Sequence, residues 1–558
     1  MTVYTDRPWL ALYSQGRPAD IALANESALA IFVSAATEAA DAPAIKYFDG
    51  VLTYGEINSA ADALAASLIA DGFAPGDRLA LYVQNDPAFV IGLVAAWKAG
   101  GAAVAVNPMN RQRELAYLLE DSGAVALLAL NELYDDVARE VVAEGTTAVR
   151  TVVTVSALDG QARDDRRVLG GQTSDVPAGT SSLTAIIAEH DGSAVRPAAA
   201  PTADDLAVLT YTSGTTGKPK GALNTHGNLA FNAQTYRDWM GLTGDDVVLG
   251  VAPLFHITGL VGHVMIAALL RAPLVLTHRF APDVMVEAIR EHRPTFTVGA
   301  ITAYIALADS GGAEAGDFAS LRALYSGGAP IAPAVADRLE RVFGAYIHNI
   351  YGLTETNSPS HAVPFGVRAP VDAESGALSV GVPVFNTVVR VIDDNGDDVP
   401  VGEVGEFATS GPQVVPGYWN RPEATAESMP GGELRTGDVG FMDTDGWFYL
   451  VDRKKDMINA SGYKVWPREV EDVLYGHPAV AEAAVVGVPD EYRGETVKAF
   501  VSLRPGASAT GEEIVEFCKA QMAAYKYPRS VEIIAELPKT ATGKVLRRTL
   551  RDEVIARS

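Results

Sequence analysis

The sequence predicts an α/β protein with two parts, a large N-terminal domain over residues 1–451 and a small α+β domain over residues 452–558. Three observations support this prediction. Apolar runs alternate with helical stretches over most of the chain, which is typical of a parallel sheet covered by helices. From about Val380 the pattern changes to short β segments, where a small β-barrel-like subdomain is expected. A charged run at residues 452–456 then separates a compact final segment.

Strand and helix patterns first alternate between about residues 78 and 130. Apolar runs predict strands at 79–83, 102–106 and 125–130, with helices between them at 89–98 and 114–119. The same alternation predicts later strands at 206–212, 247–251, 295–298, 321–326 and 346–351. Between these two regions, residues 157–205 are rich in Gly, Ser, Asp and Ala, which predicts a long surface connection with one short helix at 183–188.

The last third of the chain carries turn and cap signals of a different kind. The turn sequence Asp394-Asn395-Gly396 lies between two β segments and predicts a hairpin. After the charged run, the pattern predicts helices at 467–475 and 512–523 and strands at 483–488, 497–503 and 531–535. Pro467 stands at the first position of the first helix, where a missing N–H group does no harm. These elements make up the expected small α+β domain.

Composition and charge exclude several classes of function. The chain has 44 basic and 69 acidic residues, and its formal charge of −25 opposes non-specific binding to nucleic acid or to an anionic membrane. Cys518 is the single cysteine, so no internal disulfide can form and a reducing cytoplasm is expected. It shares a helical face with Ile514, Phe517 and Met522, which indicates a core position.

One segment imitates a membrane span. Residues 247–270 lack Asp, Glu, Lys and Arg, but they include Pro253, His256 and His263, which would leave polar groups unmatched in lipid. We therefore expect a strand, a loop and a buried helix there, and no integral membrane segment. The first residues show no apolar stretch of the kind that a secretory signal has, so export is not expected.

A segment rich in glycine and hydroxyl groups, YTSGTTGKPKG at residues 211–221, includes the end of one predicted strand. Glycines let amide groups turn around an anion, hydroxyls add donors, and Lys218 and Lys220 add positive charge, so the segment predicts a cradle for polyphosphate. Its candidate binding residues are Thr212, Ser213, Gly214, Thr215, Thr216, Gly217 and Lys218. It is not a Walker A loop, because Thr212 stands where that motif needs glycine and Pro219 where it needs Ser or Thr. A polar surface turn is the alternative, but it would not explain this combination of residues.

Six further motifs follow in order along the chain. They are SGGAP at 326–330, YGLTET at 351–356, TGD at 436–438, DRKKD at 452–456, SGYKV at 461–465 and PKTATGK at 538–544. Together with the glycine-rich segment, they resemble the adenylate-forming (AMP-binding) superfamily, in particular its acyl-CoA synthetase or fatty-acid–CoA ligase branch. The resemblance covers nearly the whole chain. It implies a ligase that joins a carboxylate to the α-phosphate of ATP, releases pyrophosphate, and then passes the acyl group to the thiol of coenzyme A.

The resemblance also implies roles for individual residues at the nucleotide. The glycine-rich segment would hold the β- and γ-phosphates, Thr354 would contact the α-phosphate, and Glu355 would ligate Mg²⁺, a hard ion that prefers carboxylate oxygen. The implied nucleotide contacts are Gly327, Gly328, Ala329, Pro330 and Tyr351 at adenine, Asp438 at ribose, and Arg453 at ribose or phosphate, and Gly352 is also counted among the binding residues. Taken alone, Glu355 could be a surface acid, Asp438 a turn residue and Arg453 part of a charged linker.

The small domain is implied to be mobile and to serve both half-reactions. Lys544 would bridge the carboxylate and the α-phosphate during adenylation, and a solvated basic tail is the alternative. Lys455 maps to the hinge. After rotation, Gly462 would leave a passage for the pantetheine arm and Lys464 would contact the adenylate or a phosphate of CoA.

The identity of the acid is the weakest prediction from the sequence. His256 maps to a gate between the carboxylate site and the thiol tunnel, and a buried core histidine is the alternative. Thr258 and Gly259 follow it, and this small lining favours a fatty acid over an aryl, branched or cyclic acid.

Two different functions are also compatible with the motifs. The acyl group could be transferred to an acyl carrier protein in place of CoA, or the chain could be a nucleotide-binding module without turnover. The presence of Glu355 and Lys544 argues against a module without turnover. A homodimer is compatible with the sequence.

Overall fold

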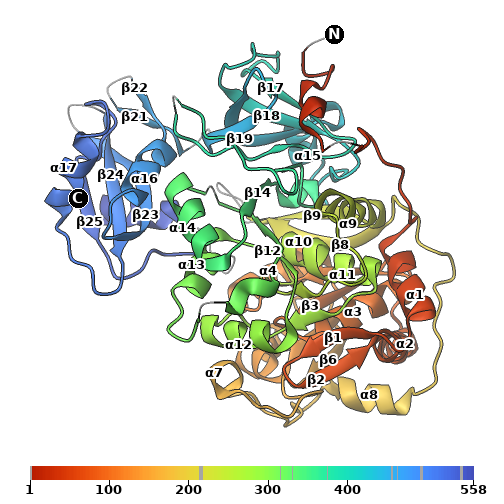
Figure 1. The fold of residues 1–558 in the computed structure, drawn as a ribbon. Coiled ribbons are helices and arrows are strands. Elements are labelled where there is room, and N and C mark those ends of the chain that lie inside the picture. Colours follow the sequence, from red (N-terminus) through yellow and green to blue (C-terminus); the bar gives the residue numbers. More distant parts are fainter. Residues whose placement is uncertain are drawn as a thin grey trace.

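Two large mixed sheets form most of the N-terminal part of the molecule, and sheets of four and five strands follow them (Figure 1). The computed structural model describes residues 3–14, 16–212, 218–314, 316–329, 331–373, 375–453, 456–460, 463–490, 494–540 and 545–557. Over these residues the predicted class, α/β with a smaller α+β part at the C-terminal end, is confirmed.

The first large sheet has the strand order β7-β6-β5-β3-β4-β8-β9. Its strands are β3 (Arg78–Tyr82), β4 (Ala102–Ala105), β5 (Ala126–Leu130), β6 (Thr151–Val155), β7 (Ser181–Ser182), β8 (Leu206–Thr212) and β9 (Lys220–Thr225). Helices α3 (Pro87–Lys98), α4 (Gln112–Ser122), α5 (Asn131–Leu133), α6 (Arg139–Ala143), α7 (Arg166–Leu169) and α8 (Leu183–Glu189) lie between them in sequence. All neighbouring strands of this sheet are parallel except β8 and β9, which form an antiparallel hairpin. The predicted short helix is α8, whereas the sequence did not predict α5, α6, α7, β6, β7 or β9.

The second large sheet has the order β16-β15-β14-β13-β12-β10-β11-β1-β2. Its strands are β1 (Pro43–Tyr47), β2 (Gly50–Thr53), β10 (Val248–Leu249), β11 (Leu274–Leu276), β12 (Phe296–Gly299), β13 (Ala323–Ser326), β14 (Ile347–Tyr351), β15 (His361–Ala362) and β16 (Val382–Pro383). Its main helices are α1 (Ala28–Glu38), α2 (Tyr54–Ala70), α9 (His226–Met240), α12 (Pro282–His292), α13 (Ile301–Ala308) and α14 (Pro333–Phe343). The middle of this sheet is parallel, and the antiparallel strands β2, β15 and β16 lie at its ends.

Polar side chains fix where several of these helices begin. Asp86 caps α3, accepting a hydrogen bond from the Ala88 N–H at 2.9 Å. Thr225 and Asn228 form a reciprocal capping box at the start of α9. Because Thr225 is also the last residue of β9, this cap sets the direction in which α9 leaves the strand that follows the glycine-rich segment.

The apolar run at 247–270 is folded as the sequence predicted. It contains β10, α10 (Ile257–Gly259), a π-helical turn (Leu260–Met265) and α11 (Ile266–Leu270), and most of it is buried. In the part of the chain that the structure describes, no helix is long and apolar enough to cross a membrane.

The four-stranded antiparallel sheet occupies the position of the predicted β subdomain, at one end of the large lobe (Figure 1). It consists of β17 (Val388–Ile392), β18 (Gly405–Ser410), β19 (Leu434–Met442) and β20 (Phe448–Arg453), with α15 (Pro422–Ser428) between β18 and β19. The predicted hairpin is present, since the Val399 N–H returns to the Val391 carbonyl at 2.9 Å. The predicted domain boundary at 451/452 falls inside β20, and it stays a prediction.

The C-terminal lobe, blue in Figure 1, is built on the five-stranded sheet. Its strands are β21 (Ile458–Ala460), β22 (Tyr463–Val465), β23 (Val480–Asp490), β24 (Gly494–Leu503) and β25 (Ser530–Ile533), and its helices are α16 (Pro467–Tyr475), α17 (Gly511–Lys519) and α18 (Arg547–Arg557). Helix α17 is shorter than the predicted 512–523. Cys518 is fully buried in a cluster with Ile514, which confirms its predicted core position.

Candidate active site

The segment after β14 is held against the β8–β9 hairpin. The short 3₁₀ turn η5 (Thr354–Thr356) follows β14 almost directly. From β9, the Asn224 side-chain amide donates to the Thr354 carbonyl at 3.2 Å and to Oδ1 of Asn357 at 2.9 Å. From α9, the Asn232 amide lies 2.9 Å from the carbonyl oxygens of both Thr356 and Asn357. Two buried asparagines therefore fix Thr354 and Glu355 beside the strands that carry the glycine-rich segment.

The ends of the glycine-rich segment are brought together by strand pairing. Ser213, Gly214, Thr215, Thr216 and Gly217 lie outside the described residues. Thr212 pairs with Lys220 in the β8–β9 register, so the two ends of the segment lie side by side. The Lys218 Nζ atom lies 5.3 Å from the ring centre of Tyr117, and the Lys220 Nζ atom lies 4.9 Å from that of Tyr418. Both lysines thus face aromatic rings beside the hairpin.

The carboxylate of Glu355 is largely buried, with 9% of the residue exposed. Its Oε1 atom accepts a hydrogen bond from the Tyr418 hydroxyl at 2.7 Å, and its carbonyl accepts one from the Val415 N–H at 2.9 Å. Among the described residues, no cluster of three or more His, Cys, Asp or Glu side chains could hold a metal. A lone carboxylate fits Mg²⁺, which proteins usually bind with one or two carboxylates while substrate phosphates and water fill the other positions.

Two predicted nucleoside residues meet directly. The Tyr351 hydroxyl donates to Oδ2 of Asp438 at 2.8 Å, and both residues are more than 90% buried. Asp438 lies on β19, where its backbone pairs with Arg453 of β20. Tyr351, Asp438 and the backbone of Arg453 are therefore adjacent, although they are up to about a hundred residues apart in the sequence.

The loop after β13 approaches β14 closely. A Cβ atom at Gly327 would lie 2.7 Å from the Ile350 carbonyl oxygen, so only glycine fits there. Gly328 has a φ of +81°, a conformation that glycine adopts without strain. Gly352, just after β14, is also crowded, because its Cβ would lie 3.0 Å from the Thr356 hydroxyl oxygen. Ala329 is partly buried beside this turn, and Pro330 lies outside the described residues.

His256 lies at the start of α10 in a loop held by two other polar residues. Its Nδ1 atom accepts the Thr258 N–H at 3.3 Å. The Asn85 side chain, at the end of the β3 region, accepts the Leu254 N–H at 2.9 Å and donates to the Ala252 and Gly250 carbonyls at 3.2 and 3.3 Å. His263, fully buried, accepts the Ala252 N–H at 3.1 Å, and burial lowers its pKa to about 4.

Gly259 has a packing role that the sequence did not reveal. A Cβ atom there would lie 2.1 Å from the Pro253 carbonyl oxygen, so backbone contact requires glycine at this position. The absence of a side chain at Gly259 is therefore not a sign of space for an acyl chain, and that part of the argument for a fatty acid was wrong.

The predicted residues of the small domain lie in or beside segments outside the described residues. Lys544, Lys455 and Gly462 lie outside the described residues. Lys464 is placed through its backbone alone, in β22 paired with Asn459. The two ends of the segment around Lys544 are defined, because Lys539 forms a β-bridge with Val545.

Arg547, at the start of α18, ties this segment to its surroundings. Its guanidinium lies 2.7 Å from Oε2 of Glu471 on α16 and 3.1 Å from Oδ1 of Asp452 on β20. Asp452 also accepts the Arg468 N–H at 3.1 Å. The Arg547 side chain is 22% exposed and lies in an ionic network, so it does not belong to a solvated basic tail, the alternative to a catalytic role for the segment around Lys544.

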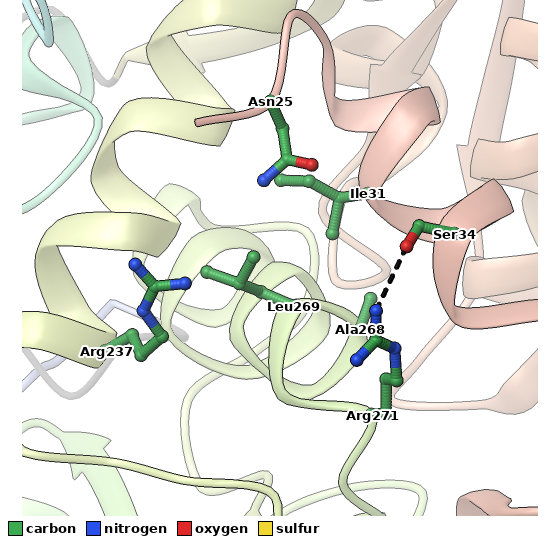
Figure 2. Close-up of a pocket in the computed structure, with 7 residues that line it drawn as sticks. All are labelled: Asn25, Ile31, Ser34, Arg237, Ala268, Leu269 and Arg271. Carbon is green, nitrogen blue, oxygen red and sulfur yellow. Dashed lines mark hydrogen bonds between the residues drawn. The ribbon is translucent and has the colours of Figure 1, made fainter. Parts of the chain in front are cut away.

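A cavity of about 180 Å³ lies apart from these residues, between α1, α9 and α11 (Figure 2). It is lined by Asn25, Ile31, Ser34, Arg237, Ala268, Leu269 and Arg271. Both arginines already pair with carboxylates, Arg237 with Asp238 and Arg271 with Glu38. None of the predicted site residues lines this cavity.

The chain is similar to known proteins over most of its length. The chain matches the model of AMP-binding enzymes over residues 32–419 and that of the AMP-binding enzyme C-terminal domain over residues 469–544. A long-chain-fatty-acid–CoA ligase of Bacillus subtilis is 35% identical over 561 residues, 98% of each chain. A feruloyl-CoA synthase of an Amycolatopsis species is 38% identical over 91% of this chain and 95% of its own. The crystal structure of an anthranilate CoA ligase in complex with anthranoyl-AMP is similar with a TM-score of 0.85 and 27% identity, over 97% of this chain and 99% of that one. The chain therefore belongs to the family of AMP-binding enzymes, in its acid–CoA ligase branch.

Proposed function

We propose that this acid–CoA ligase activates a fatty acid with ATP and Mg²⁺, using the residues that converge around η5. The observation that carries the proposal is the adjacency of Tyr351 and Asp438 to the turn that bears Glu355. An aromatic ring and a carboxylate suit a base and a vicinal diol, and the next residues along the chain suit phosphates. A nucleoside bound at Tyr351 would therefore direct its phosphates toward Thr354, Glu355 and the glycine-rich segment.

The first half-reaction requires positive charge, because a carboxylate must approach an anionic triphosphate. Lys218, Lys220 and the amide groups of the glycine-rich segment would bind the β- and γ-phosphates. Glu355 would hold Mg²⁺, which when bound offsets phosphate charge. Lys544 would bridge the attacking carboxylate and the α-phosphate, where charge accumulates as pyrophosphate leaves.

The second half-reaction requires a thiol at the same acyl carbon. We propose that residues 452–558 rotate about Lys455, so that Gly462 and Lys464 replace Lys544 and admit the pantetheine arm of CoA. The thiol attacks the acyl carbon, the acyl–phosphate bond breaks, and AMP leaves. No enzyme nucleophile is needed, since the adenylate is already activated. His256, in the loop held by Asn85, would separate the acid from the thiol tunnel.

A fatty acid is favoured by the relative that is named a long-chain-fatty-acid–CoA ligase and spans the whole chain. An aryl acid is the second candidate, because the relative named feruloyl-CoA synthase has the higher identity, 38% against 35%. An acyl carrier protein is the alternative acceptor, and a homodimer remains an expectation.

The test is AMP release from the purified protein with ATP, Mg²⁺, CoA and a panel of medium- and long-chain, branched, cyclic and aryl acids. The expected result is AMP release that depends on acid and is fastest with a fatty acid. A higher kcat/KM for ferulate-like acids would replace the fatty acid by the aryl candidate. Release of AMP with a carrier protein but not with CoA would change the acceptor, and no release with any acid would contradict the proposal.

A further inference from the structure

The segment that precedes α15 lies directly against the strand that follows the glycine-rich segment. The Leu223 N–H donates to the Gly417 carbonyl at 3.0 Å, and the Trp419 N–H donates to the Gly221 carbonyl at 2.8 Å. Tyr418, between these contacts, forms a β-bridge with Ala222. Its backbone is therefore fixed relative to β9.

The side chain of Tyr418 reaches from this position to Glu355. Its ring packs in a small core with Ala222, Val415, Met429 and Leu434, and 8% of the residue is exposed. Its hydroxyl donates to Oε1 of Glu355 at 2.7 Å.

The same ring also faces a cation of the glycine-rich segment. The Lys220 Nζ atom lies 4.9 Å from the ring centre. One side chain therefore contacts the implied metal ligand through its hydroxyl and a phosphate-binding lysine through its face. Partners that orient a ligating carboxylate tune metal affinity by about 10- to 100-fold.

We propose that Tyr418 is a positioning residue that orients the Glu355 carboxylate for the Mg²⁺–nucleotide complex. The proposal rests on the role of Glu355 given under Proposed function. The hydrogen bond occupies one carboxylate oxygen and fixes the plane of the group, so that the other oxygen is presented in a defined direction. The same ring holds the Lys220 ammonium group over its face, at a fixed position relative to the Glu355 carboxylate.

The experiment measures nucleotide binding rather than turnover. Wild type and Tyr418→Phe are titrated by calorimetry with α,β-methylene-ATP, whose α–β bond the enzyme cannot break, with EDTA and with saturating Mg²⁺. Tyr418→Phe keeps the ring, its packing and the contact with Lys220, and removes the hydroxyl alone. We expect unchanged affinity in EDTA and an Mg²⁺-dependent gain in affinity that falls about 10-fold or more, the range seen for outer-shell partners of metals.

The matched control is Tyr449→Phe, which also removes a buried phenol that donates to a carboxylate, here Asp443 at 3.0 Å. Tyr449→Phe should behave as wild type. A Glu355→Gln variant completes a double-mutant cycle, in which Tyr418→Phe should have no further effect.

The outcomes separate this proposal from the one on which it rests. If Glu355→Gln abolishes the Mg²⁺-dependent gain and Tyr418→Phe leaves it intact, the positioning role is overturned while the metal role stands. If Tyr418→Phe weakens binding equally with and without Mg²⁺, Tyr418 is a packing residue only. If wild type shows no Mg²⁺ dependence, or Glu355→Gln retains it, both roles are wrong.

Discussion

Replacing Asn85 by alanine should destabilise the loop that carries His256. The side chain makes three hydrogen bonds across the two large sheets, one accepted from Leu254 and two donated to Ala252 and Gly250. Asn85 and Leu254 are both buried, so water cannot fully replace these partners. At about 0.5–1.5 kcal/mol for each net hydrogen bond, the expected loss for the three bonds is about 1.5–4.5 kcal/mol. The loss should be concentrated in residues 250–256.

The assay combines thermal unfolding with amide hydrogen exchange of peptides that cover this loop. Asn131→Ala is the control, because Asn131 is equally buried but its side-chain amide donates to Thr173 alone, at 3.0 Å. That variant should lose about 0.5–1.5 kcal/mol. The reasoning is refuted if Asn85→Ala costs no more than Asn131→Ala, or if exchange in the loop is unchanged.

Three further variants test other parts of the structure. Lys544→Ala should raise the activation barrier for acid-dependent pyrophosphate release by about 2–4 kcal/mol, as for one removed electrostatic donor. Supplied acyl-adenylate should still be converted to acyl-CoA. Equal losses in both assays would contradict the assigned role. Asp62→Ala should lower the free energy of unfolding, measured with denaturant, by about 3–5 kcal/mol. The Lys98 Nζ atom lies 2.7 Å from the Asp62 carboxylate, and the substitution leaves this buried charge without its counterion. The control is Asp20→Ala, at the exposed pair with Arg7, which should lower the free energy of unfolding by at most about 1 kcal/mol. Burial raises the pKa of Asp86 to about 7, so the folded state retains a proton that the unfolded state loses, and stability conferred at low pH declines as the pH rises toward 7. Asp86→Asn, which can still cap α3, should therefore gain stability relative to wild type as the pH rises from about 4 to about 7, and parallel stability profiles would contradict this.

Four strands of the first large sheet, β3, β4, β5 and β8, were predicted because each lies in an apolar run, whereas β6 and β9 were missed. In contrast, β7 has two residues and α7 has four, within a polar stretch, and such short elements show no periodicity. Helix and strand ends differed from the predictions by a few residues, since caps such as Asp86 add polar residues that an apolar pattern does not include.

The motifs of the site could be found locally, but the residues that hold them in place could not. The hydrogen-bond partners of these residues are 63 to 169 residues away in the sequence, as is seen for Asn224, Asn232, Asn85 and Tyr418. A lone asparagine or tyrosine in an apolar stretch gives no indication of such a distant partner. The ion pairs of Arg547 could not be predicted for the same reason, because Glu471 and Asp452 are 76 and 95 residues away. Only the folded chain brings these groups together.

The burial of Cys518 has a practical consequence for measuring this enzyme. The thiol lies in the core of the C-terminal lobe, and burial raises its pKa to about 12, so very little thiolate is present near neutrality. A thiol-reactive dye added to the native protein should therefore report free coenzyme A without a background from the polypeptide. Consumption of CoA can then be measured by adding the dye to timed samples of the reaction and reading the dye's absorbance, with no need to block or mutate the enzyme.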